Sequence, residues 1–194
     1  MVPTVPPPRS SPEADACAQW YARELDWATA GTAPVQLLTG LRFDVLELPA
    51  AAGHAALRRV GRTGPVALAG QRMWLLVAAG SADEVPGLLD WLEWGGIALA
   101  MAAIGTGGHI DAPAPPGRAG SSSGAAFWLR PPEPRQDVEP QLPALAGLGS
   151  RGGDTPDLVR LVDAAATECH RVRLTRARTH LLTDRPTGQP LAFS

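Results

Sequence analysis

The residues best suited to acid–base or metal chemistry lie on two short apolar runs. Asp44 and Glu47 lie on the first run, and His109 and Asp111 lie on the second. Side chains alternate between the faces of a strand, so residues two apart share a face and residues three apart do not. His109 and Asp111 are therefore predicted to share a face, where they could act as an acid–base pair or as two metal ligands. A surface strand face also explains them.

The densest positive stretch is the segment 170–180, which carries Arg171, Arg173, Arg176 and Arg178. Four arginines can neutralise several phosphates, and binding of that kind is sensitive to salt. The segment has no Trp, Tyr or Phe on which a base could stack. Cations near the C-terminus of a helix also interact favourably with its dipole. Nucleic-acid contact and a solvated helix end are thus two open interpretations of Arg171–Arg178.

Two other features are weaker candidates for a functional site. The run Gly105–Gly108 could cradle a phosphate with its backbone N–H groups, but neither GK[ST] nor GxGxxG follows, and a tight turn between strands is the alternative. Cys17 and Cys169 lie far apart, outside any motif of metal-ligand spacing, which predicts free thiols. The sequence therefore contains no cysteine motif with the spacing of metal ligands.

Composition limits the classes of partner. The net charge of −2 gives the whole protein no attraction to nucleic acid or to an anionic membrane, so such binding requires a local patch. All 17 basic residues are arginine, and alanine, glycine and proline are abundant, as in GC-rich bacterial genomes. No apolar run has the length of a signal peptide or of a membrane span. We expect a cytoplasmic protein without membrane contact.

Short apolar runs separated by glycine and proline alternate with helical patterns. Strands are predicted at 35–38, 43–48, 66–68, 73–77, 97–101, 109–112 and 126–129. Helices are predicted from a Ser11 cap to Gly31, over 50–60, over 83–94, and from an Asp154 or Thr155 cap onward. These elements predict one α+β or α/β domain with a mixed central sheet and flanking helices.

Five segments follow from this pattern. Residues 1–10 are a proline-rich tail, 11–132 the α/β domain, 133–153 a Pro/Gly-rich linker, 154–180 a C-terminal helix with an arginine-rich end, and 181–194 a second tail. The spacings of Trp20, Trp27, Trp91 and Trp94 suit core packing. An exposed subset of these tryptophans would instead indicate a protein-binding surface.

The stretch 39–132, with the residue before it, resembles the N-terminal domain of bifunctional DNA primase/polymerases, the prim-pol branch of the archaeo-eukaryotic primase superfamily. The resemblance covers about half of the chain and rests on the order of several short pieces. These pieces are Leu38–Gly40 with Phe43–Pro49, the strand that follows Gly70–Arg72, Gly107–Pro113, and Phe127–Pro132.

The resemblance implies a two-metal site for nucleotide polymerisation. It has two acids two residues apart at the end of the first strand, a histidine on a following strand, and a further acid, and the carboxylates hold two divalent ions. In this chain Glu47 matches the first acid and Pro49 the second, while the histidine falls at or beside Met73, next to Arg72. Proline cannot bind a metal, so the resemblance implies a degenerate site.

Arg72 could contact a phosphate or could be a solvent-facing charge at a strand edge. Glu47 could equally be a partly buried acid with a local partner. The leading hypothesis is a non-catalytic regulatory module that binds nucleic acid or protein and needs no cofactor. The alternatives are a divergent nucleotidyltransferase with a divalent metal held by Glu47, His109 and Asp111, and a protein-interaction scaffold.

Overall fold

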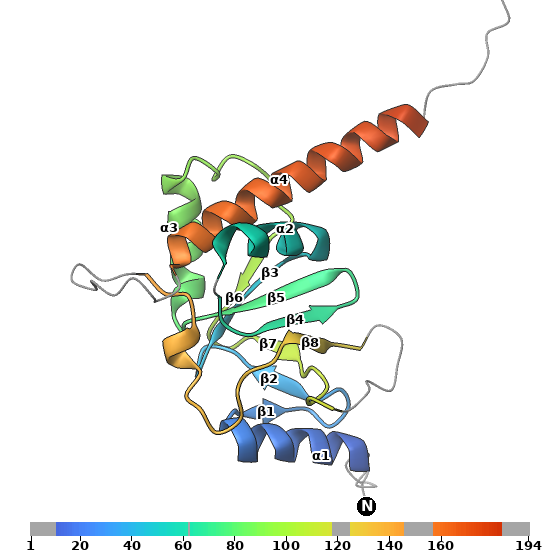
Figure 1. Ribbon diagram of the computed structural model, residues 1–194, viewed down its shortest axis with the longest axis vertical. Helices are drawn as coiled ribbons and strands as arrows, with labels where there is room; N and C mark the ends of the chain where they lie inside the picture. The colour runs from blue at the N-terminus through green and yellow to red at the C-terminus, as the bar shows by residue number, and fades with distance from the viewer. Residues whose placement is uncertain (1–10, 62, 118–124, 146–156, 184–194) are drawn as a thin grey trace, which may run out of the picture.

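Two antiparallel sheets form the centre of the molecule (Figure 1). The computed structural model describes residues 11–61, 63–117, 125–145 and 157–183. The larger sheet has the strand order β6 (Ala102–Ile104), β3 (Asp44–Pro49), β5 (Arg72–Val77), β4 (Val66–Ala69), β8 (Phe127–Arg130). The smaller sheet has the order β1 (Thr29–Ala30), β2 (Gln36–Leu38), β7 (His109–Asp111). The predicted α+β domain is confirmed, but the central sheet is antiparallel and not mixed as predicted, since the named strands of both sheets pair antiparallel.

Helices cover the larger sheet on one face, and the smaller sheet covers the other (Figure 1). The helices are α1 (Pro12–Trp20), a π-helical turn η1 (Tyr21–Leu25), α2 (Ala50–Val60), α3 (Ser81–Trp91), a 3₁₀ turn η2 (Glu139–Gln141) and α4 (Leu158–Thr183). Helices α2, α3 and α4 pack on one side, and α1 lies beyond the smaller sheet (Figure 1). In the described helices, no segment has the length and hydropathy needed to cross a membrane.

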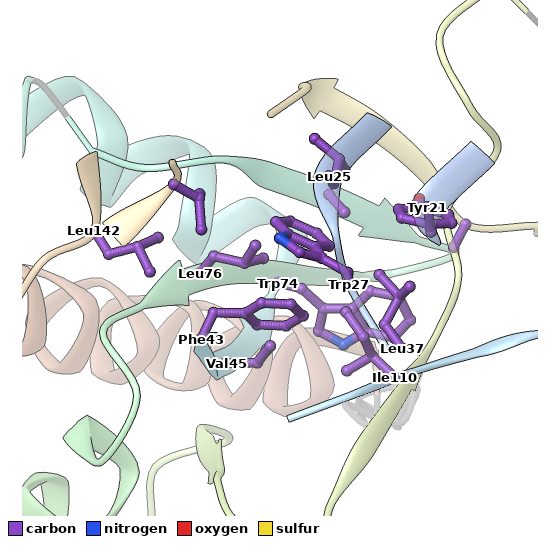
Figure 2. Packing of buried hydrophobic residues seen from close by; sticks show 13 residues of the cluster. Tyr21, Leu25, Trp27, Leu37, Phe43, Val45, Trp74, Leu76, Ile110 and Leu142 are labelled. Atoms are coloured by element: carbon purple, nitrogen blue, oxygen red, sulfur yellow. The ribbon is translucent and has the colours of Figure 1, made fainter. Parts of the chain in front are cut away.

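The two faces of β3 and β5 belong to two hydrophobic cores, and each strand is buried at five of its six positions. The first core lies toward the smaller sheet and contains Val45, Trp74 and Leu76. Figure 2 shows this core, with Leu142 toward one end and Tyr21 toward the other. The helix-side core contains the alternate residues, among them Leu46 and Met73, with the buried side chains of α4. The sheet is thus a central layer buried on both faces.

The helix patterns were mostly predicted correctly. Helix α2 has the predicted bounds, and the Ser11 hydroxyl caps α1 by accepting a hydrogen bond from the Ala14 amide at 3.2 Å. The first helical segment ends at Leu25, before the predicted Gly31, because Asp26 adopts a left-handed conformation with φ of 54°. Helix α3 ends at Trp91, one turn before the predicted end.

The strand predicted at 97–101 is wrong, and the strand of this region is β6 at 102–104. The apolar side chains of 97–101 explain the error, since Leu99 and Met101 pack on the helix-side core from a loop. This loop is held by side chains, because Arg72 donates to the Ala100 carbonyl and Arg173 donates to the Ala98 carbonyl, each at 3.0 Å.

The described part of the predicted linker, 133–145, packs against the fold. Val138 and Leu142 are buried in the first core, and the Pro143 carbonyl accepts a hydrogen bond from the Ala78 amide at 2.9 Å. The proline-rich composition thus correctly indicated irregular backbone in this segment. It did not indicate that the described part of the segment belongs to the core. Residues 146–153 lie outside the described residues.

The C-terminal helix α4 begins at Leu158, where the Asp157 carboxylate accepts a hydrogen bond from the Val159 amide at 2.8 Å. The predicted caps Asp154 and Thr155 lie outside the described residues, as do 1–10 and 184–194 of the predicted tails. Helix α4 extends to Thr183, past the predicted end at 180. Its C-terminal half projects away from the body of the protein (Figure 1).

Candidate functional site

Glu47 lies on β3 with both carboxylate oxygens engaged. The register of β3 and β5 places Glu47 opposite Trp74 and Pro49 opposite Arg72. Arg72 donates from Nη2 and Nε to Oε1 of Glu47, at 2.7 and 2.9 Å. The Trp74 indole donates to Oε2 at 2.7 Å. Glu47 therefore has a local hydrogen-bonding set supplied by the neighbouring strand.

These contacts oppose metal binding at Glu47. A divalent cation needs carboxylate lone pairs directed at it, and the guanidinium of Arg72 already neutralises the Glu47 charge and repels a second cation. Pro49, which lies on the same face of β3, is buried and has no ligand atom in its side chain. The residues at this position do not fit a two-metal site.

Met73, at the position matching the histidine of the prim-pol pattern, points to the opposite face of β5 from Arg72. It is fully buried in the helix-side core. A Cβ added at Gly53 of α2 would overlap the Met73 sulfur, so the helix packs very closely on this side chain. Met73 thus serves the packing of α2 on the sheet.

Asp44 also points away from Glu47, as the strand periodicity predicts. Its Oδ2 accepts a hydrogen bond at 2.9 Å from the Ala82 amide, in the first turn of α3. A carboxylate at a helix N-terminus is stabilised by the helix dipole and by the free amides there. Buried Asp44 therefore positions α3 on the sheet and cannot join Glu47 in one site.

His109 and Asp111 lie on β7 with their side chains exposed and Ile110 buried between them. The predicted shared face is confirmed, but β7 belongs to the smaller sheet and Glu47 to the larger one. The described residues contain no group of three or more His, Cys, Asp or Glu side chains placed to hold a metal ion. The segment Gly105–Gly108 forms the turn that joins β6 to β7.

The five candidate arginines fall into two groups. Arg72, Arg171 and Arg173 have partners: Arg72 binds Glu47, Arg173 donates to the Ala98 carbonyl, and Arg171 binds Glu168 at 2.9 Å. Within the described part of the chain, the exposed side chains of Arg176 and Arg178 form no hydrogen bond or ion pair. Of the five candidates, Arg176 and Arg178 are therefore the two that are fully available to a ligand.

Buried Glu168 links α4 to α2. Its Oε1 accepts from Arg171 at 2.9 Å and pairs with Arg59 of α2 at 3.1 Å. Beside it, burial raises the pKa of the Cys169 thiol to about 11, with Arg72 lowering it and Glu168 raising it by smaller amounts. At neutral pH the thiol is therefore protonated, which fits a packing role. The described cysteines, Cys17 and Cys169, are both free.

The Glu47–Arg72 pair can be tested by a double-mutant cycle of stability. We expect Glu47→Gln and Arg72→Met to couple by about 1–2 kcal/mol, since hydrogen-bonded neighbours couple by about 0.5–3 kcal/mol and this pair is partly exposed to water. Urea unfolding of the wild type, both single variants and the double variant measures the coupling. Additive effects would contradict the paired geometry.

The partners of Glu47 could not be identified from its own sequence neighbourhood. Trp74 and Arg72 are two residues apart, a spacing that predicts a common face, but the register that brings them to Glu47 is fixed only by the pairing of β3 with β5.

No protein-family model, curated protein or solved structure matches this chain.

Proposed function

We propose that this chain is a catalytically degenerate prim-pol-like domain that acts as a non-catalytic regulatory module and contacts nucleic acid. The observation that carries the proposal is the engagement of Glu47 by Arg72 and Trp74 beside Pro49. The position resembling the first catalytic acid is thereby used for a structural contact. A module of this kind acts through binding.

The end of α4 is the surface that supports nucleic acid as the ligand. The sequence from 169 to 183 contains four arginines and no acidic residue, although the chain as a whole has a net charge of −2. The side chains of 173–179 are exposed, and this part of the helix projects from the body (Figure 1). A helix with a local positive field and free arginines can follow a phosphate backbone.

We expect Arg176→Glu/Arg178→Glu to weaken binding to single- and double-stranded DNA and RNA by at least about tenfold at low salt. Each lost phosphate contact also lowers the slope of log K against log salt by about 0.7–0.9. Fluorescence anisotropy titrations at several salt concentrations measure both quantities. Arg23→Glu, which reverses one exposed charge on the distant segment η1, is a control for charge reversal outside α4.

Equal binding by the wild type and Arg176→Glu/Arg178→Glu, or no binding by the wild type at low salt, would contradict this ligand. The non-catalytic part of the proposal has a separate test in a metal-dependent primer-synthesis and primer-extension assay. We expect no activity. Robust extension that Glu47→Ala abolishes would overturn the proposal in favour of the divergent nucleotidyltransferase.

A further inference from the structure

Helix α3 has an exposed face that is acidic and carries a large aromatic side chain. Asp83, Gly87 and Asp90 recur at i, i+4 and i+7, with Glu84 and Trp91 beside them on the same side of the helix. All five residues are exposed, and the Trp91 side chain is 72% exposed, contrary to the core position predicted for it. We call these five residues the α3 face.

The α3 face is open to close approach and its charges are free. A Cβ added at Gly87 would meet no atom within 4 Å. Asp83, Glu84 and Asp90 form no ion pair or side-chain hydrogen bond with other described residues. An exposed tryptophan flanked by unpaired carboxylates is typical of a surface that receives an apolar and cationic partner.

The projecting end of α4 has the complementary pattern. We call residues 171–179 the α4 arm. Arg171, Leu174 and Arg178 recur at i, i+3 and i+7, so Leu174 lies between two arginines on one side of the helix. Leu174 is 50% exposed, and Arg178 has no partner in the described part of the chain.

The α4 arm cannot reach the α3 face of its own molecule. Helix α4 packs beside α3 through its earlier turns, where Trp94 donates to Asp163 at 3.3 Å, and the arm then points away from α3 (Figure 1). A straight helix cannot return onto α3. The acidic α3 face and the basic α4 arm, each with an exposed apolar side chain, can therefore meet only between two molecules.

We propose that the α3 face is the docking site for the α4 arm of a second copy of this chain. Leu174 packs on Trp91 beside Gly87, and Arg178 pairs with Asp90. A guanidinium can also stack on the indole face of Trp91. Since each molecule carries both surfaces, two copies can exchange arms reciprocally about a two-fold axis, which closes the assembly. This self-association does not require the nucleic-acid binding proposed above.

Sedimentation velocity and light scattering on the full, nuclease-treated chain test the docking site. At low salt and about 100 µM protein, we expect a dimer whose population falls as salt rises. Trp91→Ala and Arg178→Glu each weaken the dimer by at least about tenfold, as expected for residues at the centre of an interface. Asp90→Arg weakens it similarly, and Arg178→Glu combined with Asp90→Arg restores it at least in part.

Leu41→Ala and Glu133→Arg are controls, since both residues are exposed outside α3 and α4, and neither changes the association. Circular dichroism confirms that each variant is folded. A monomer under all conditions, or a dimer unaffected by Trp91→Ala and Asp90→Arg, would overturn the docking site. Failure of the charge reversal to restore any association would also count against it. If the wild type forms the dimer but does not bind nucleic acid at low salt, only the function proposed above is contradicted.

Discussion

Replacing Leu142 by alanine is expected to lower the free energy of unfolding by about 2–5 kcal/mol, the range for a leucine truncated inside a packed core. Leu142 is 1% exposed and belongs to the first core. A Cβ added at Gly64 would lie 2.9 Å from Leu142 Cδ2, so the glycine beside β4 leaves room for this side chain. The proline-rich segment that carries Leu142 thus closes one end of the core.

Leu145→Ala is the matched control, because Leu145 lies three residues later in the same segment and is 42% exposed. We expect it to cost less than about 1 kcal/mol, since nearly half of its surface is already in water. Urea or thermal unfolding of the two variants gives the comparison. Similar small effects for Leu142→Ala and Leu145→Ala would mean that 133–145 is only a tether between the domain and α4.

Local patterns predicted those elements whose burial repeats regularly along the chain. Strands β3 and β5 carry mostly apolar residues because they are covered on both faces, and α2 begins and ends at the predicted residues. The opposite directions of Asp44 and Glu47 also followed from strand periodicity and were confirmed. Properties fixed within a single element could therefore be predicted.

Properties that depend on pairing between distant elements could not. Glu47 and Trp74 are 27 residues apart in sequence, and Arg173 and Ala98 are 75 apart. The acceptor in the second contact is a backbone carbonyl, which every residue has, so no residue type marks it. Candidate phosphate-binding arginines looked alike in sequence, and only the tertiary contacts separate Arg72 and Arg173 from Arg176 and Arg178.

The core position predicted for Trp91 was wrong for a different reason. Its spacing from Trp94 suited core packing on one helix face, but α3 ends at Trp91 and the chain leaves the helix before Trp94. Trp94 then turns to α4, where its ring centroid lies 5.8 Å from that of His170. A helical spacing that runs past the helix end places two tryptophans in different environments, and this exposes the residue on which the proposed dimer depends.

The junction between the two sheets is the site of the second large expected effect, Gly40→Ala. Thr39 binds the turn between β6 and β7 at two points, since its hydroxyl donates to the Gly105 carbonyl at 2.6 Å and its amide donates to the Gly108 carbonyl at 3.1 Å. Gly40 has φ of 84°, and a Cβ there would overlap Thr106 Cα and lie 2.8 Å from Thr106 N. The backbone segments touch directly.

Gly40→Ala combines two costs, about 1–2 kcal/mol for a left-handed alanine and about 1–3 kcal/mol for forcing packed backbone apart. We expect a loss of about 2–5 kcal/mol in the free energy of unfolding, measured by urea denaturation. Gly70→Ala isolates the first cost, because Gly70 has φ of 55° with no atom within 4 Å of an added Cβ. If both variants lose the same stability, Gly40 serves the turn alone and the close contact with Thr106 does not hold the sheets together.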